Sequence, residues 1–208
     1  MGDRLATGIA ALDRELEGGL PTGRVVLLTA PADSQAELLV SRIANGPDTA
    51  YLSSERPASS VRSAMETTDV SVDELTVYDV GTDTPILDSI RYLRESIDQE
   101  LVVVDPVDAL EGGGRDQYRE FLVALGRQMD ATDATALLYA LDEPSTPTAR
   151  TLTAYMADVV LNLETTVRDG TVYNRLTVPK YRGGAAFEES MRLELTERVG
   201  VDTSRDIA

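Results

Sequence analysis

Five short apolar segments, each rich in β-forming residues, alternate with helical patterns along most of the chain. The clearest of them, LVVVD at residues 101–105, is apolar at successive positions, so both of its faces are suited to burial. Such strands are typical of parallel sheets, because helices cover both faces of the sheet. The segments predicted to form strands are residues 25–29, 49–53, 75–80, 101–105 and 135–141.

Two of the intervening stretches have the spacing of amphipathic helices. In residues 86–97, one helical face carries Ile86, Ile90, Leu93 and Ile97. In residues 116–129, the apolar face carries Tyr118, Phe121, Leu122, Leu125 and Met129. We therefore predict an α/β fold, with a mostly parallel central sheet and helices on both of its faces.

The last third of the chain has a different pattern. Two β-rich segments meet at Asp169-Gly170, a dipeptide that favours a two-residue hairpin turn, and residues 187–197 predict one more strand. The sheet is therefore expected to end in antiparallel strands. Residues 111–116 and 142–150 have the composition of loops. We predict a single domain over residues 1–208, with its core at about 4–199 and a short tail at 200–208.

The charge of the chain is strongly one-sided. Acidic residues number 36 against 19 basic ones, the net charge is −17, and Lys180 is the single lysine. The carboxylates are spread along the whole chain, a composition typical of proteins that work in molar salt, where the Debye length falls to about 3 Å. We therefore expect a halophilic, archaeal protein; the other interpretation is an acidic protein from an ordinary environment. The sequence contains no basic stripe of the kind that would indicate a nucleic-acid partner.

Several sequence features are absent, and each absence excludes a class of protein. The chain has no cysteine and no histidine, so disulfide bonds, thiolate ligands and histidine ligands are excluded, and we predict no metal site. No segment has the roughly eighteen consecutive apolar residues of a membrane span. The N-terminal residues MGDRLATG lack the apolar core of a signal peptide. We expect a cytoplasmic protein that does not bind membranes.

The segment VVLLTAPADSQAELLV reads as a strand, a tight loop and a helix, the order in which phosphate-loop proteins build a nucleotide site. The loop departs from the pattern G-x-x-x-x-G-K-[ST]. Ala30 stands at the first glycine and Gln35 at the second, while Ala36 replaces the lysine and Glu37 the hydroxyl residue. The loop thus lacks the positively charged side chain that would bind a triphosphate. Glu37 and Asp33 would instead place carboxylates beside it.

Ser34 and Glu37 fit the capping box S-x-x-E at the start of the helix that follows. In a capping box, Ser34 accepts from the amide of Glu37, and Glu37 reaches back to the amide of Ser34. The positive helix end would then be satisfied by the chain itself. The alternative is an ordinary capped helix without any relation to nucleotides. The predicted degenerate phosphate-loop position comprises Ala30, Asp33, Ser34, Gln35, Ala36 and Glu37.

The residues before this loop resemble the opening of KaiC-like proteins within the RecA superfamily. Those proteins carry the stretch T-G-x-x-x-L-D-x-x-x-x-G-G-[IL]-P-x-G ahead of their first core strand. The residues that stand where this pattern places them are Thr7, Gly8, Leu12, Asp13, Gly18, Gly19, Leu20, Pro21 and Gly23. The resemblance covers about residues 4–199. It implies a RecA-like P-loop fold and an ATPase core that uses ATP and magnesium and assembles into rings or filaments.

Later segments resemble further parts of these ATPases, in the same order. The resemblance implies a catalytic base at Glu55 and a Walker B aspartate at Asp105. LTVPKYRGG resembles the K-x-R-G segment that reaches a neighbouring subunit's nucleotide, which implies an intersubunit role for Lys180 and Arg182. Each also has a plainer interpretation: a helix cap for Glu55, a structural hydrogen bond for Asp105, and a solvated sheet edge for the two cations. Asp108 is expected to be a loop or cap residue.

We predict that the isolated chain has lost ATP hydrolysis and acts as a regulatory or assembly protein, with a protein partner or as an oligomer. No cofactor is expected; ATP and magnesium would bind only if weak binding through backbone amides survives. A second hypothesis is a mixed ATPase ring in which Lys180 and Arg182 complete a partner's ATP site. A third is a recombinase-like DNA-binding paralogue, although neither a basic patch nor a helix-turn-helix supports it.

Overall fold

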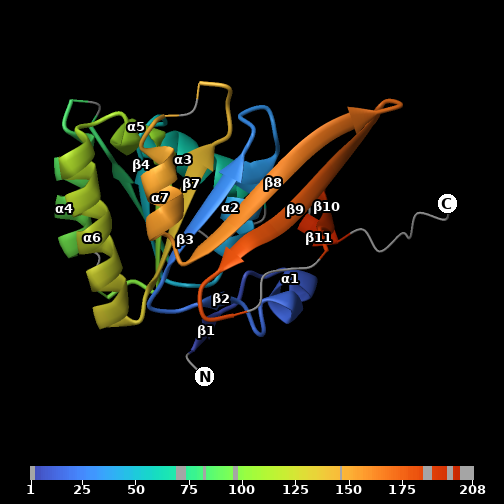
Figure 1. Ribbon diagram of the computed structural model, residues 1–208, viewed down its shortest axis with the longest axis horizontal. Coiled ribbons are helices and arrows are strands. Elements are labelled where there is room, and N and C mark those ends of the chain that lie inside the picture. The colour runs from blue at the N-terminus through green and yellow to red at the C-terminus, as the bar shows by residue number, and fades with distance from the viewer. Residues whose placement is uncertain are drawn as a thin grey trace.

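The computed structural model describes residues 3–68, 74–81, 83–95, 98–145, 147–184, 189–195 and 199–201. At its centre lies a 9-stranded sheet with the order β11-β10-β9-β8-β3-β7-β6-β4-β5, and helices flank this sheet on both sides (Figure 1). The pairs from β8 to β5 are parallel, whereas the pairs from β8 to β11 are antiparallel. The predicted α/β fold class, including its antiparallel C-terminal strands, is confirmed.

The five strands predicted from apolar segments are all present, and their ends agree with the prediction within one residue. They are β3 (Val25–Ala30), β4 (Thr49–Ser53), β5 (Leu75–Asp79), β6 (Leu101–Asp105) and β7 (Thr135–Leu141). Every residue of β4 and β6 is buried, as expected for strands covered on both faces. The carboxyl ends of these parallel strands therefore meet at one edge of the sheet.

The helices form one layer on each face of the sheet. The first layer contains α1 (Ala10–Glu15), α2 (Ala36–Ile43) and α3 (Ala58–Thr67). The second contains α4 (Pro85–Glu95), α5 (Asp108–Glu111), α6 (Arg115–Thr132) and α7 (Arg150–Met156). The predicted apolar face of α6 is confirmed, because all five of its named residues are buried. On α4, Ile86 and Leu93 are buried and Ile90 is partly buried, while Ile97 lies outside the described residues.

The two segments predicted as loops are shorter than expected. Of residues 111–116, only the three glycines at 112–114 separate α5 from α6, because Arg115 already begins α6. The loop at 142–150 ends where Arg150 begins α7. The prediction was wrong at these ends because glycine- and proline-rich composition hides the short helical turns beside it.

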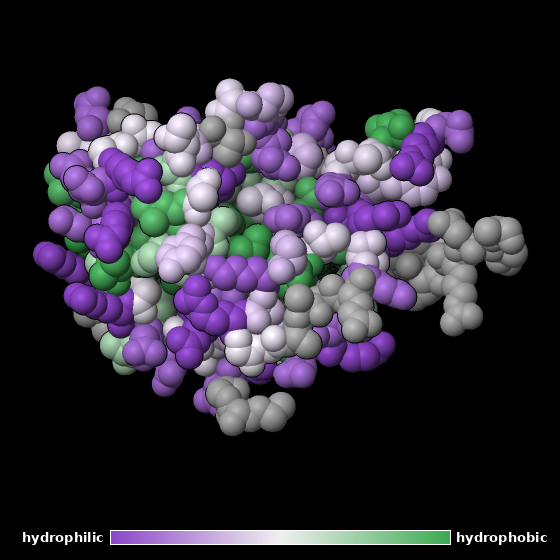
Figure 2. Space-filling view, in the orientation of Figure 1, coloured by the Kyte–Doolittle hydropathy of each residue, from purple (hydrophilic) through white to green (hydrophobic). Residues whose placement is uncertain are grey.

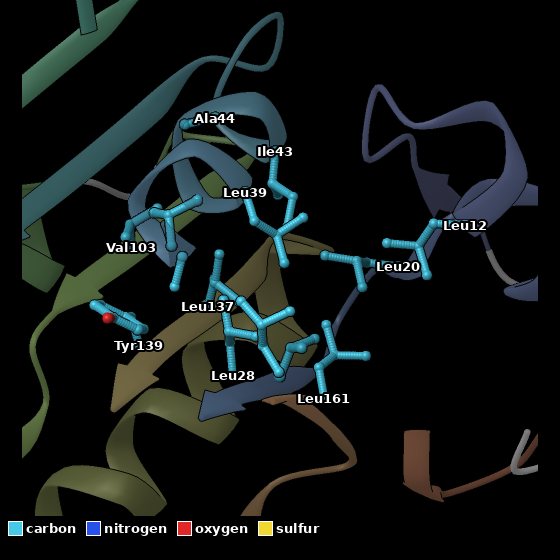
Figure 3. Packing of buried hydrophobic residues seen from close by; sticks show 14 of the residues in the cluster. Leu12, Leu20, Leu28, Leu39, Ile43, Ala44, Val103, Leu137, Tyr139 and Leu161 are labelled. Carbon is cyan, nitrogen blue, oxygen red and sulfur yellow. The ribbon is translucent and has the colours of Figure 1, made fainter. Parts of the chain in front are cut away.

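The core on the α2 side joins side chains from distant parts of the chain. Figure 3 shows Leu28, Leu137 and Leu161, from three neighbouring strands, facing Leu39 and Ile43 of α2. All five side chains are buried. Burial of a leucine or isoleucine side chain contributes about 1.5–3 kcal/mol, so this contact holds α2, and the loop before it, firmly on the sheet.

The N-terminal pattern residues have structural roles. β1 (Arg4–Leu5) and β2 (Leu20–Pro21) form a separate antiparallel pair. Both the amide and the hydroxyl of Thr7 donate to Asp13 Oδ1 at 2.7 Å, which ties the chain to α1. Gly19 has φ +124°, and a Cβ at this position would lie 2.2 Å from the carbonyl oxygen of Leu5. Only glycine fits there.

The hairpin predicted at Asp169-Gly170 is confirmed. It joins β8 (Val159–Arg168) to β9 (Thr171–Tyr181), and both turn residues have positive φ, 50° and 77°. β10 (Met191–Leu195) is the additional predicted strand, and β11 (Val199–Val201) follows it. Of the rest of the predicted segment, residues 189–190 precede the strand, and residues 187–188 and 196–197 lie outside the described residues. Within the described residues, no helix has the length and apolar character needed to cross a membrane.

Candidate functional site

The candidate site lies at the carboxyl end of β3, where the chain turns into α2. Ala30 is buried at the end of the strand, and its carbonyl accepts from the amide of Asp142 at 2.8 Å. Three amides of the loop already have partners within the chain. The amide of Ala32 donates to Glu143 Oε1 at 3.0 Å, that of Ser34 to the carbonyl of Pro31 at 3.1 Å, and that of Ala36 to Ser34 Oγ at 3.3 Å.

The predicted reciprocal capping box is wrong. Gln35 is the N-cap of α2 and makes no side-chain cap. Ser34 Oγ does accept an amide, but the amide of Ala36 rather than that of Glu37, and it donates to the carbonyl of Pro31 at 2.6 Å. Glu37 does not turn back to Ser34, because a guanidinium from the turn after β4 competes for its carboxylate.

Arg56 supplies that guanidinium. It follows β4 by three residues, and its Nη1 donates to Glu37 Oε2 at 2.7 Å. Its Nη2 donates to Asp105 Oδ2 at 2.8 Å. Since Ser53 at the end of β4 lies in register with Asp105 at the end of β6, the turn after β4 brings Arg56 over the strand ends. Arg56 thus bridges the first turn of α2 and the carboxyl end of β6.

Asp105 is buried at the centre of this cluster, with 4% of its surface exposed. The phenol of Tyr51, also buried, donates to the same Oδ2 that receives Arg56. Burial, together with the negative charge of Asp105, raises the pKa of Tyr51 well above its usual value. The Tyr51 phenol therefore stays protonated and remains a donor to Asp105.

Arg56 stays charged in this setting. Its partial burial opposes the charged form, but the carboxylate of Asp105 outweighs that effect and raises the pKa of Arg56 above its usual value. The guanidinium side chain is 31% exposed and Glu37 55%, so the Arg56–Glu37 pair is the weaker and more solvated of the two contacts. The buried Asp105 end anchors the bridge.

Two further acidic residues border the loop. Glu55, the predicted base, is exposed and makes no hydrogen bond or ion pair with a described residue. Glu143 follows β7, and one of its carboxylate oxygens accepts from the amide of Ala32. In a phosphate-binding loop, backbone amides of this type donate to the phosphate group instead. The rim of the loop is therefore acidic and is partly closed by the chain's own carboxylate.

The residues at this site do not fit a magnesium ion. The carboxylates of Glu37 and Asp105 are the donors that such an ion would need, and both already bind the guanidinium of Arg56. Nowhere in the described part of the chain do three or more acidic side chains gather as a metal site would need.

A second polar network lies behind the site, between α5, α7 and β7. Arg150 Nε donates to both carboxylate oxygens of Glu111 at 2.9 Å, and its Nη2 donates to Asp108 Oδ1 at 2.7 Å. The other oxygen of Asp108 accepts from the Leu141 amide at 3.0 Å. Thr153 and Tyr118 complete the network. Asp108 is therefore structural, but it is the first residue of α5 and not the predicted loop or cap residue, since Val107 is the N-cap.

Lys180 and Arg182 lie at the opposite end of the sheet from the loop. Lys180 pairs with Val160, near the start of β8, whereas the loop follows the end of β3. Lys180 Nζ donates at 2.8 Å to the carbonyls of Ala154 and Tyr155, the last turn of α7. Burial and the charge of Arg182 lower the pKa of Lys180. Arg182 binds the same Tyr155 carbonyl at 3.2 Å and pairs with Asp158.

The structure thus brings together part of the predicted site. Glu37 and Asp105 meet through Arg56, and the rest of residues 30–37 lies beside them. Glu55 stands apart from this contact, and Lys180 and Arg182 lie far from it along the sheet. The prediction missed Arg56, Tyr51 and Glu143. The position of Arg56, directly after Glu55 at the end of a strand, was the one available sequence signal.

Comparison with solved structures shows the fold. A KaiC-like protein, PH0186 from the hyperthermophilic archaeon Pyrococcus horikoshii OT3, has a similar structure, with a TM-score of 0.80. The similarity covers 97% of this chain and 100% of that chain at 17% sequence identity. The chain therefore has a RecA/KaiC-like fold. Because 565 chains of solved structures are similar, the fold alone does not indicate an activity.

Comparisons of sequence place the chain in a family. No curated protein matches it. The model of DUF7125, described as a family of unknown function, matches residues 4–208, and the chain belongs to this family.

Proposed function

We propose that this chain is a RecA/KaiC-like protein with a degenerate phosphate loop, which does not hydrolyse ATP and acts in regulation or assembly with a protein partner. The position of Arg56 supports this most directly. It binds Glu37 and Asp105, which correspond to the hydroxyl residue and the Walker B aspartate that hold magnesium in phosphate-loop ATPases. We infer that a cation of the chain itself takes the place of the metal.

The composition of the loop supports the same conclusion. Phosphoryl transfer depends on positioning the triphosphate and neutralising its charge, chiefly through a lysine and the metal ion. Ala36 stands at the lysine position, and the chain's single lysine, Lys180, binds the end of α7 at the other end of the sheet. With the amides of Ala32, Ser34 and Ala36 used internally and the carboxylate of Glu37 in the first turn of α2, the loop offers a triphosphate repulsion and fewer donors.

Phosphate release in molar potassium chloride, with magnesium and ATP, tests this proposal. The matched control is Glu55→Ala, which removes the base predicted from the sequence and leaves the Arg56 bridge in place. We expect the two proteins to release phosphate at the same background rate. A rate for the unmodified chain clearly above that of Glu55→Ala would show turnover at this site and would refute the proposal.

A second candidate function is a mixed ATPase ring in which this chain completes a partner's ATP site. The observation that favours it is the place of Lys180 and Arg182, at the end of the sheet remote from the chain's own loop. Any nucleotide that they touch would belong to another subunit. Arg182 is exposed, and Tyr155 beside it is 72% exposed, so this end has accessible cationic and aromatic groups.

The ATPase rate of a co-purified partner tests the second candidate. Lys180→Ala combined with Arg182→Ala should lower that rate at least about tenfold, the loss expected for removal of about 1.4 kcal/mol of transition-state stabilisation. Circular dichroism must show that the variant keeps its helix content, because Lys180 also binds α7. An unchanged partner rate with a folded variant would eliminate this candidate.

A further inference from the structure

The turn that follows β7 is attached to the loop at residues 30–37 by two hydrogen bonds. The amide of Asp142 donates to the carbonyl of Ala30 at 2.8 Å, and the amide of Ala32 donates to Glu143 Oε1 at 3.0 Å. Because β3 and β7 are neighbours in the sheet, their carboxyl ends lie side by side (Figure 1). The carboxylate of Glu143 thus occupies one amide of the degenerate phosphate-loop position.

The contact between Glu143 and Ala32 is open to water. Ala32 is exposed and Glu143 is partly buried, and Figure 2 shows hydrophilic and intermediate side chains around the turn after β7. A glutamate side chain loses up to about 2 kcal/mol of rotamer entropy when it is fixed, which is comparable to the gain from one hydrogen bond. The contact therefore depends on how firmly the backbone of Glu143 is held.

Arg150 and Asp108 hold the backbone directly before this turn. Among the described residues, the pairing of β7 with β6 ends at Leu138. Beyond that point, the carbonyl of Leu141 accepts from Arg150 Nη1 at 2.8 Å, and the amide of Leu141 donates to Asp108 Oδ2 at 3.0 Å. Two side chains thus take the place of a neighbouring strand and satisfy the last residue of β7.

The two side chains are themselves fixed by ion pairs with little exposure to water. Arg150 Nη2 donates to Asp108 Oδ1 at 2.7 Å, and Arg150 Nε donates to both carboxylate oxygens of Glu111 at 2.9 Å. The side chain of Arg150 is 11% exposed and that of Glu111 is fully buried. We call Arg150, Asp108 and Glu111 the Arg150 clamp. Because separation of a buried ion pair is costly, the clamp is the rigid part of this connection, and the contact between Glu143 and Ala32 is its weak part.

We propose that Arg150 is a positioning residue for Glu143, and that Glu143 acts as an internal anion that blocks the amide of Ala32 to an external one. The clamp fixes Leu141, the chain continues for two residues, and the carboxylate of Glu143 then reaches the loop. The loop is thus controlled from α7 as well as by its own sequence. The inference rests on the proposed function, because it explains what keeps the degenerate loop closed to a phosphate group.

Hydrogen exchange of backbone amides, followed by NMR in molar potassium chloride, tests the connection at Ala32. Glu143→Ala removes the acceptor and should speed exchange at Ala32 by about threefold to tenfold, the effect of one hydrogen bond. Arg150→Gln acts at a distance and should speed exchange there by the same factor, and Arg150→Lys by less. The control Arg91→Gln breaks another arginine ion pair, with Asp88 on α4, and should leave exchange at Ala32 unchanged.

A paired variant covers the case in which Arg150→Gln does not fold, because that substitution leaves Glu111 charged and buried. Arg150→Met plus Glu111→Gln removes both charges together, and circular dichroism checks its helix content. Ala32 should exchange faster in this variant too, and Glu143→Ala added to it should give no further increase, because the same contact is already lost. Unchanged exchange at Ala32 in a folded clamp variant, or two increases that add in full, would overturn the role of Arg150.

Inorganic phosphate tests the blocking role of Glu143. In Glu143→Ala, the NMR signal of the Ala32 amide should shift as phosphate is added, whereas in the unmodified chain it should stay in place. The absence of a shift in the variant, or an equal shift in both proteins, would overturn this role. These measurements involve neither ATP nor its hydrolysis, so they can fail while the proposed lack of ATPase activity holds, and the reverse.

Discussion

Arg56 connects two carboxylates that would repel each other if they were left alone at the strand ends. Its contact with the buried Asp105 is the stronger, because Asp105 is 4% exposed and a carboxylate without a partner there would lose its hydration. The phenol of Tyr51 shares the same oxygen. The three side chains form one hydrogen-bonded unit at the end of β6.

Replacement of Arg56 by alanine should lower the free energy of unfolding by about 1–3 kcal/mol, because it leaves the buried Asp105 with Tyr51 as its remaining side-chain donor. Urea unfolding measures this change. Arg62→Ala on α3, which removes an arginine without a described ion pair, is the matched control and should change the free energy by less than about 0.5 kcal/mol. Equal changes in the free energy of unfolding for the two substitutions would show that the Arg56 bridge does not stabilise the fold.

Because three tyrosines are buried, we expect the free energy of unfolding to fall at alkaline pH. Burial raises the pKa of Tyr51, Tyr118 and Tyr139 above the usual value near 10. As the pH rises above about 10, the unfolded chain loses these protons before the folded chain does, so the free energy of unfolding falls. Below that pH the contribution is fully present.

Urea unfolding at a series of pH values from about 8 to about 11 measures this loss. Phenolate absorbance should appear for these three tyrosines only as the chain unfolds, and Tyr51→Phe should make the fall in stability less steep. Ionisation of all 8 tyrosines while the fold persists would contradict the prediction.

The hairpin turn is the element whose sequence most directly specifies its geometry. Gly170 has φ +77°, where an alanine side chain is strained, so Gly170→Ala should destabilise the chain by about 1 kcal/mol. Gly126 provides a control within α6, where an added Cβ meets no atom within 4 Å. Gly126→Ala should stabilise by roughly 0.5–1 kcal/mol, because alanine is the better helix former. Thermal unfolding of both variants should therefore show shifts of opposite sign.

Elements that depend on local composition could be predicted from the sequence, whereas short elements fixed by tertiary contacts could not. The parallel strands were evident because each is an uninterrupted apolar segment between turn signals. α5 has 4 residues and α7 has 7, too few for a helical period to be recognised. Both are held by the Arg150–Glu111–Asp108 network, which joins residues far apart in the chain.

The same distinction applies to the candidate site. Asp105 could be placed at the sheet edge because it ends an apolar strand, and ligands collect at the carboxyl ends of such strands. The capping box failed because its glutamate has a competing partner 19 residues away, Arg56, which only the fold brings near. The local sequence pattern gives no sign of this contact, because the contact arises from the turn after β4 and from the pairing of β4 with β6.

At the scale of the whole molecule, the excess of carboxylates predicts a dependence on salt. A net charge of −17 repels itself in the compact state, and molar salt screens that repulsion over about 3 Å. The melting temperature should therefore rise steadily from low to molar potassium chloride. Sucrose, which is excluded from the surface but does not screen charge, is the control and should stabilise far less. Equal effects of salt and sucrose would favour the interpretation as an ordinary acidic protein.

The central claim is that the chain's own groups occupy the place of a triphosphate and its metal ion at residues 30–37. Isothermal titration of ATP with magnesium, in molar potassium chloride, tests it most directly. We predict no heat of binding, because Arg56 already bridges Glu37 and Asp105 and the amides of Ala32 and Ala36 are in use. Saturable binding with a micromolar dissociation constant would contradict the claim.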